Sequence, residues 1–113
     1  MANSFVNKKV DLTTTSVTTL YTVPDATNSI IKSILVSEDS GNADTITVTI
    51  TDTSDNVFSL FKTKSISANG TTELLSAPLV LQQNEILKVT AATANRLHVV
   101  LSALESKPRE VIT

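Results

Sequence analysis

The side chain with the widest chemical range in this chain is its single histidine, His98, which lies in an alternating apolar run. A histidine acts as a general base when a carboxylate orients it and a nucleophile and a substrate pocket lie beside it. Serines and aspartates occur throughout the chain, but no spacing associates one of them with His98. There is no cysteine, which excludes cysteine nucleophiles, disulfides and thiolate metal ligands, and one histidine does not make a usual zinc site. We therefore predict no enzymatic activity, no metal and no cofactor.

Acidic residues gather in two polar segments that we expect to be turns, and loop carboxylates are ligands of calcium. Glu38, Asp39 and Asp44 lie in the first segment, and Asp52 and Asp55 lie in the second. Neither segment has the twelve-residue pattern of alternating acidic ligands that ends in a glutamate. The spacing favours solvated turn carboxylates, and a loop-bound Ca²⁺ ion stays open as the alternative.

Charge and composition argue against nucleic acid, membrane and sugar ligands. The 9 basic and 11 acidic residues give a net charge of −2, and the lysines are spread over several segments instead of forming a basic stripe. No run approaches the ~20 apolar residues of a membrane span, and the N-terminus lacks the apolar stretch of a signal peptide. One tyrosine and three phenylalanines are too few for an aromatic sugar-binding platform, so we expect these rings to pack in the core.

The residue types that dominate the chain are those that favour strands. Of the 113 residues, 18 are threonine, 12 valine and 8 isoleucine, and all three types are stiff at χ1 and fit a pleated sheet. The clearest strand is the segment TITVTIT at 45–51, in which Ile46, Val48 and Ile50 alternate with threonines. Because neighbours in a strand point to opposite faces, we predict these three side chains in the core and the threonines toward water.

Further runs resemble strands and are separated by short polar clusters, a spacing typical of a sandwich or barrel. They cover 16–23, 29–37, 56–66, 71–75, 85–91 and 97–104. Asn69 and Gly70 form the strongest short hairpin signal, because a type I′ turn needs a positive φ at both central residues. With Thr71 they also fit an N-glycosylation acceptor, but without an expected secretory signal the hairpin is the favoured interpretation. The stretch 90–95 is expected to be a loop.

Together these runs predict an all-β protein, a single antiparallel β-sandwich, jelly-roll-like or immunoglobulin-like, of about eight strands with extended terminal arms. The two ends are more charged than the middle, and the C-terminal one contains Pro108. We expect an N-terminal arm at 1–11, the sandwich domain at 12–105 and a C-terminal arm at 106–113.

Two segments resemble the small β-sandwich virion structural proteins of tailed bacteriophages, LYTVPDATNSIIKSI at 20–34 and SAPLVLQQNEILKVTAATANRLHVVLSALE at 76–105. That family has a YTVP strand end, a later PLVL-x-x-G-(D/E)-x-L corner and a closing strand that ends in LE. The matching positions here are 21–24, 78–81, Glu85, Leu87 and 104–105. At the two places where the pattern favours glycine, this chain has Asp25-Ala26 and Asn84.

This resemblance implies a non-enzymatic structural component of a bacteriophage virion, first of all a capsid decoration or cement protein that stabilises the head lattice. A tail, neck or fibre accessory protein is the alternative, together with a receptor- or carbohydrate-binding module. The implied location is the virion, assembled in the host cytoplasm. The implied partners are further copies of this chain, with a trimer favoured, and other virion proteins such as the major capsid protein, and neither nucleic acid nor membrane.

Two features indicate where such partners would bind. The run 29–37 is apolar on both faces, as in an interface strand, and the C-terminal arm ends in apolar residues after Pro108. The competing interpretations are a central strand and disordered tails. The residues that we predict to contact partners are Ile30, Lys32, Ile34, Val36, Val111 and Ile112.

Overall fold

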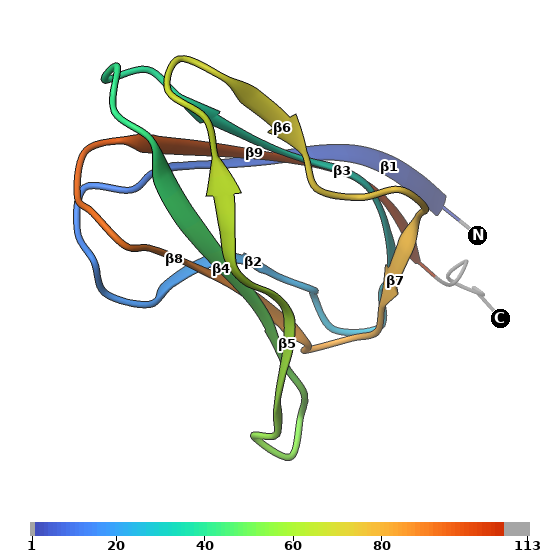
Figure 1. Cartoon of the computed structure of the whole chain (residues 1–113). Coiled ribbons are helices and arrows are strands. Elements are labelled where there is room, and N and C mark those ends of the chain that lie inside the picture. The colour runs from blue at the N-terminus through green and yellow to red at the C-terminus, as the bar shows by residue number, and fades with distance from the viewer. Residues whose placement is uncertain (1, 108–113) are drawn as a thin grey trace, which may run out of the picture.

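The computed structural model describes residues 2–107, which form nine strands in two antiparallel sheets packed face to face (Figure 1). The strands are β1 (Ala2–Asp11), β2 (Thr18–Thr22), β3 (Asn28–Glu38), β4 (Asp44–Thr51), β5 (Val57–Ile66), β6 (Thr71–Glu73), β7 (Leu79–Leu81), β8 (Ile86–Ala91) and β9 (Leu97–Lys107). Sheet A has the order β1-β9-β3-β6, with β7 also paired to β3, and sheet B has the order β2-β8-β4-β5. The prediction of an all-β antiparallel sandwich is confirmed. Within residues 2–107 no helix is long and apolar enough to cross a membrane.

The core lies between the sheets and is filled by alternate residues of the long strands. Ile46, Val48 and Ile50 of β4 are buried, as their alternation predicts, and Val99 and Leu101 of β9 are buried on the opposite sheet. The threonines of β4 are half-buried or buried instead of facing open water. The reason is that β4 is a central strand between β8 and β5, so side chains of both neighbours flank its threonines.

The double-faced apolar pattern of β3 comes from a β-bulge. The pairing of β3 with β9 shifts register between Ile31 and Ser33, with Lys32 as the additional residue. A bulge adds one residue to one strand and so changes which side chains face inward beyond it. Ile31 before the bulge and Ile34 after it both point into the core, although strict alternation would place them on opposite faces.

The N-terminal segment differs from its prediction as an arm. Residues 2–11 form the edge strand β1, which pairs with β9 in an unbroken antiparallel register from Ala2 opposite Lys107 to Asp11 opposite His98. Among residues 3–11, only Val6 and Val10 pack against the core, so the strand is held mainly by backbone hydrogen bonds and its side chains give little periodic signal. β9 also continues through Lys107, two residues beyond the predicted end of the domain.

The hairpin prediction at Asn69-Gly70 is wrong. Asn69 has a φ of 56°, but Gly70 does not have a positive φ, so the turn is not type I′. It connects β5 of sheet B with β6 of sheet A, and these two strands do not pair. The Gly70 N–H donates to the Ser67 carbonyl, and a Cβ on Gly70 would lie 3.1 Å from that oxygen. Glycine is therefore favoured here by the tight space beside Ser67 and not by its φ.

Two loops at one end of the sandwich contain residues in the left-handed region. Ala26, in the β2–β3 loop, has a φ of 53°, and Asn84, in the β7–β8 loop, has a φ of 65°. These are the two regions where the resembled pattern favours glycine, so the backbone geometry gives that preference a physical reason. The loops are also joined, because the Ala26 N–H donates to Gln83 Oε1 at 2.8 Å and the Asn84 N–H donates to the Val23 carbonyl at 2.8 Å.

Replacing Ala26 by glycine is expected to stabilise the protein. An L-residue in the left-handed region is strained by about 1–2 kcal/mol, and glycine removes that strain. Glycine also raises the conformational entropy of the unfolded chain, but the resulting loss of stability is smaller than the strain removed. We expect Ala26→Gly to raise the free energy of unfolding by about 0.5–1 kcal/mol, which is a rise in Tm of about 2–6 °C. Ala77→Gly is the control, since Ala77 is exposed and its φ is not positive. Equal losses of Tm in both variants would contradict the strain at Ala26.

Candidate functional site

The outer face of sheet A has a row of apolar side chains that crosses four strands. Phe5 of β1 is opposite Leu104 of β9, Leu104 is opposite Ile30 of β3, and Ile30 is opposite Val80 of β7. Directly opposite residues project to the same face of a sheet, and this face is the outer one, because the residues next to Leu104 and Ile30 in sequence are buried. Phe5 is 83 % exposed and Val80 is 60 % exposed. We call these four residues the apolar row.

A second row lies farther along the same face and combines apolar side chains with opposite charges. Lys9 is opposite Val100, Val100 is opposite Leu35, and Leu35 is opposite Glu73 of β6. We call these four residues the mixed row. Its acidic end is fixed, because the Glu73 carboxylate accepts the hydroxyl of Ser33 and, at 2.8 Å, the backbone N–H of Ile34. Desolvation raises the pKa of Glu73, but these hydrogen bonds outweigh it and lower the pKa, so this end of the row stays negative.

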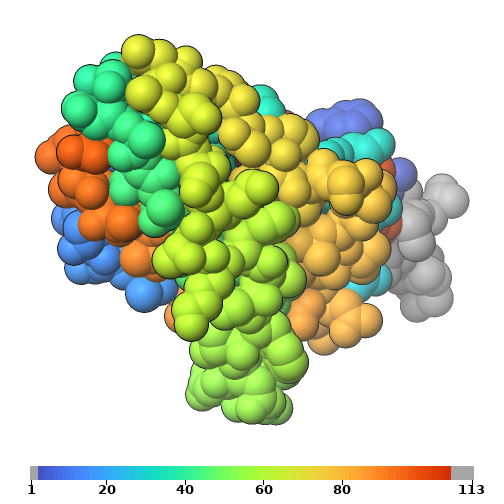
Figure 2. All heavy atoms as spheres, in the orientation of Figure 1, coloured from blue at the N-terminus to red at the C-terminus, as the bar shows by residue number. Residues whose placement is uncertain are grey.

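A second exposed apolar surface lies on the β4–β5 hairpin. Figure 1 shows this hairpin extending beyond the rest of the sandwich, and Figure 2 shows it as a protrusion of the molecular surface. Val57 and Phe58 are more than half exposed, and Leu60 is 36 % exposed. We call these three residues the hairpin patch. The expectation that the aromatic rings pack in the core is wrong for Phe58 and Phe5, and it holds for the buried Tyr21 and in part for Phe61.

The tip of this hairpin is ordered by Asp52. Its Oδ1 accepts the backbone N–H groups of Ser54 and Asn56, both at 2.9 Å, and its Oδ2 accepts the Asn56 side-chain amide. The hydrogen bond from the Asn56 backbone is the main cause of the lowered pKa of Asp52, so the carboxylate that organises the tip stays ionised. The hairpin patch is therefore presented on a preorganised turn.

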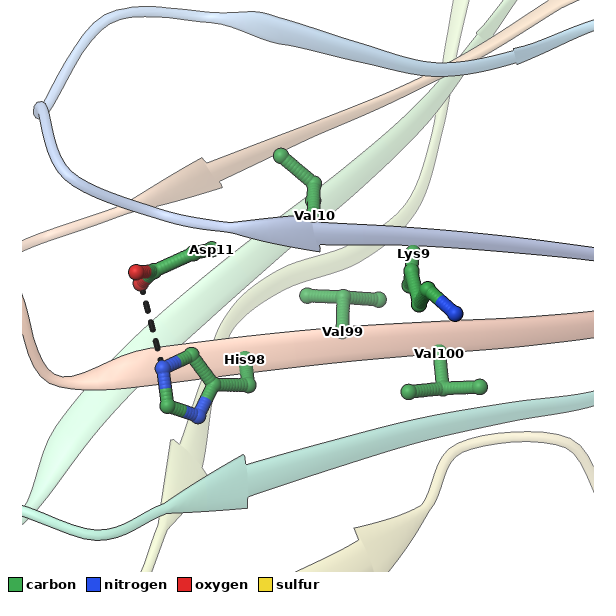
Figure 3. A pocket seen from close by; sticks show the side chains of 6 residues that line it. All are labelled: Lys9, Val10, Asp11, His98, Val99 and Val100. Carbon is green, nitrogen blue, oxygen red and sulfur yellow. Dashed lines mark ion pairs between the residues drawn. The ribbon is translucent and has the colours of Figure 1, made fainter.

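His98 lies at the surface between two carboxylates, of which Figure 3 shows Asp11. Its Nε2 is 3.1 Å from Asp11 Oδ1, and its Nδ1 is 3.6 Å from Asp39 Oδ2. The hollow beside it has a volume of about 240 Å³ and is lined by Lys9, Val10, Asp11, His98, Val99 and Val100. Because none of these six is a serine, threonine or tyrosine, the hollow offers His98 no hydroxyl nucleophile. Within residues 2–107, moreover, no group of three or more His, Cys, Asp or Glu side chains is placed so that it could hold a metal ion.

A buried polar cluster connects the two sheets. The Tyr21 hydroxyl on β2 donates to Glu105 Oε2 on β9 at 2.5 Å and lies 3.1 Å from the Ser29 hydroxyl on β3. All three residues are buried. Burial, followed by the hydrogen bond to Glu105, raises the pKa of Tyr21 to about 12. Tyr21 and Glu105 belong to the YTVP and LE elements of the phage resemblance, so two parts of that pattern that are far apart in sequence form one contact.

Glu38 at the end of β3 connects two loops. Its side chain is buried, and its carboxylate accepts the backbone N–H groups of Ser40, Gly41 and Asn69 as well as the Ser40 hydroxyl. Desolvation raises the pKa of Glu38, but the hydrogen bonds, led by that of the Ser40 hydroxyl, outweigh it and lower the pKa to about 2. The interpretation as a solvated turn carboxylate is therefore wrong for Glu38, which links the β3–β4 loop to the turn between the sheets.

The stability contributed by Glu38 is expected to depend on pH. Its pKa is lower in the folded protein than its ordinary value of 4.5, so this stability is present above about pH 4.5 and is lost as the pH falls toward 2. We expect Glu38→Gln to lower Tm clearly at pH 7, because the amide cannot accept all of these N–H groups. The difference from wild type should shrink progressively below pH 4.5 in thermal unfolding experiments. Asp25→Asn, at an exposed carboxylate, is the control, and a pH-independent difference for Glu38→Gln would contradict the assignment.

The structure places the predicted partner-binding residues in three different environments. Ile30 lies in the apolar row, and Lys32 is exposed at the bulge. Ile34 and Val36 have no exposed surface and belong to the core, so a partner cannot touch them on this face. Val111 and Ile112 lie outside the described residues. The other members of the apolar row were missed because they come from strands far apart in sequence, and only the pairing register brings them together.

No protein-family model matches the chain, and none of the curated proteins matches it. The class is therefore defined by the fold and its surfaces: an antiparallel two-sheet β-sandwich that exposes an apolar row on one sheet and a hairpin patch on the other.

Proposed function

We propose that this protein is a non-enzymatic structural subunit of a bacteriophage virion, in the first place a capsid decoration protein. The observation that supports this most is the hairpin patch, where Val57, Phe58 and Leu60 are exposed on a hairpin that extends from the domain. Exposed apolar side chains that gather on one projecting element are typical of a protein–protein contact. The resemblance of 20–34 and 76–105 to virion proteins gives the class of partner.

In this role the protein stabilises a lattice by binding it. Phe58 inserts into an apolar depression of the capsid surface and gains about 25 cal/mol for each Å² of apolar area that leaves water. The tip ordered by Asp52 lowers the entropy lost on binding, since the hairpin is already in its bound shape. A subunit that binds only the assembled lattice raises the stability of that lattice by mass action.

The experiment uses particles of the encoding phage from which this gene has been deleted. Purified full-length protein is added, its binding is quantified, its position is determined by electron microscopy, and the temperature of head disruption is measured. We expect saturable binding to heads and a higher disruption temperature. Binding only to tails, necks or fibres would favour the alternative accessory role, and no binding to any part of the particle would contradict the proposal.

Two variants test whether the hairpin patch makes this contact. Phe58→Ser removes an exposed ring, so the domain should stay folded while its affinity for heads falls at least tenfold. Val17→Ser is the matched control, because Val17 is 65 % exposed and lies in the loop before β2. Wild-type affinity for the Phe58 variant would show that the contact lies elsewhere on the molecule.

A further inference from the structure

We propose that the outer face of sheet A binds the same face of a second copy of this chain, around a two-fold axis that runs parallel to the strands between β9 and β3. This surface is separate from the hairpin patch, and the inference does not rest on the phage role. It rests on the pairing register, which makes two rows of this face complementary to themselves.

The apolar row is the first part of this complementarity. A two-fold rotation about the stated axis places β9 over β3 of the second copy and β1 over its β7 side. Leu104 then lies over Ile30 of the second copy, and Phe5 lies over Val80. Each contact occurs twice, as an isologous interface requires. The two most exposed apolar residues of the row, Phe5 and Val80, are thereby covered by each other.

The mixed row supplies charge complementarity under the same rotation. Its order across the sheet is Lys9, Val100, Leu35 and Glu73. The rotation reverses this order in the second copy, so Lys9 lies over Glu73 and Val100 lies over Leu35. Opposite charges meet at both ends and apolar side chains meet in the middle. A shift by one strand would break this match, so the charges fix the register of the two copies.

The size of the face also suits a second copy. β9 has eleven residues, which at ~3.3 Å per residue gives a length of ~36 Å, and four strands spaced ~4.8 Å apart give a width of ~19 Å. The face therefore covers ~700 Å², close to the ~800 Å² that each partner buries in a stable interface of standard size. Two sheets that stack in this way pack as the two sheets of a sandwich do.

The sheet edges are less suited to association than this face. Lys8 of the edge strand β1 is opposite the buried Leu101 and so projects toward the core side while it remains exposed. An inward-pointing lysine on an edge strand hinders the addition of another strand. The edge strand β5 has two register shifts and a positive φ at Thr63, which interrupt a regular row of hydrogen-bonding groups. The three remaining edge strands, β2, β6 and β7, are short, with 5, 3 and 3 residues.

The test is the mass of the full-length protein in solution, measured by sedimentation equilibrium over a range of concentrations. We expect a reversible dimer of twice the 12.1 kDa chain mass. Phe5→Ser and Lys9→Glu, both at exposed positions, should weaken dimerisation at least tenfold. At concentrations low enough for the wild type to be monomeric, they should leave Tm unchanged. Phe58→Ser and Lys64→Glu are the controls, since they make the same changes on sheet B, and they should leave the dimer intact.

A rescue variant makes the test specific to the two-fold axis. Lys9→Glu places a glutamate over Glu73 of the second copy, and adding Glu73→Gln removes that repulsion while the amide oxygen still accepts a hydrogen bond from Ile34. We expect the double variant to regain most of the lost affinity. A monomer at millimolar concentration, a trimeric mass, or dimerisation unaffected by Phe5→Ser and Lys9→Glu would each overturn the proposal.

Discussion

Replacing Val48 by aspartate is expected to prevent folding. Val48 has no exposed surface and lies at the centre of β4, opposite Val89 of β8 and Phe61 of β5. An unpaired carboxylate at that position costs several kcal/mol, which is a large part of the roughly 5–15 kcal/mol that stabilises a small domain. Far-ultraviolet circular dichroism and thermal unfolding of the purified variant should show neither the wild-type β spectrum nor a cooperative transition.

Thr47→Asp is the matched control for this effect. Thr47 is the preceding residue on β4, it points to the opposite face, and it is half-buried. Its hydroxyl accepts the Thr63 N–H at 3.1 Å, and a carboxylate at the same position can accept that hydrogen. We therefore expect this variant to fold with a moderately lower Tm. Equal destabilisation by the two substitutions would mean that the inward and outward faces of β4 have been assigned incorrectly.

Replacing Tyr21 by phenylalanine is expected to have the second largest effect. It removes the hydrogen bond to Glu105 and leaves a buried carboxylate without this donor, at a cost of about 2–3 kcal/mol. Thermal unfolding at pH 7 should show a Tm lower by about 10 °C. A double-mutant cycle with Glu105→Gln measures the coupling, and we expect the double variant to lose clearly less than the sum of the two single losses. Additive losses would show that the pair does not act as a unit.

The pH dependence of Tyr21 provides an independent check. Its pKa is raised from 10.0 to about 12 in the folded protein, so folding favours the protonated phenol. The stability from this group is present below pH 10 and declines as the pH rises from 10 toward 12. Tyr21 is the single tyrosine of the chain, so an ultraviolet titration of tyrosinate reports on it alone. A midpoint near 10 in the folded protein would contradict the buried contact, and Tyr21→Phe should abolish this part of the alkaline destabilisation.

The candidate site could be predicted only in part. Ile30 was identified from the apolar run that contains it, but the same run also indicated Ile34 and Val36, which the bulge at Lys32 turns into the core. Phe5 gave no usable signal, because it lies in a charged segment without apolar alternation. Its role depends on its position opposite Leu104, and no local pattern contains that information.

The sequence by itself determined the strands in which buried and exposed side chains alternate. The alternation of Ile46, Val48 and Ile50 specifies a strand and its inward face. A side-chain period of two follows from the geometry of a single strand and does not depend on its neighbours. The closing strand β9 was predicted for the same reason. The all-β class follows from these patterns together with the large share of threonine, valine and isoleucine.

Only the tertiary structure decided how the strands are paired and what their pairing assembles. The edge strand β1 depends on backbone hydrogen bonds to β9, which any sequence free of proline can make. The turn at Asn69-Gly70 crosses between sheets because β6 finds its partner in β3 and not in β5. The contact of Tyr21 with Glu105 and both rows of sheet A likewise join residues from distant strands. Pairing register is set by the free energy of the whole packed core, so a local pattern fixes which side of a strand is buried and leaves open which strand lies beside it.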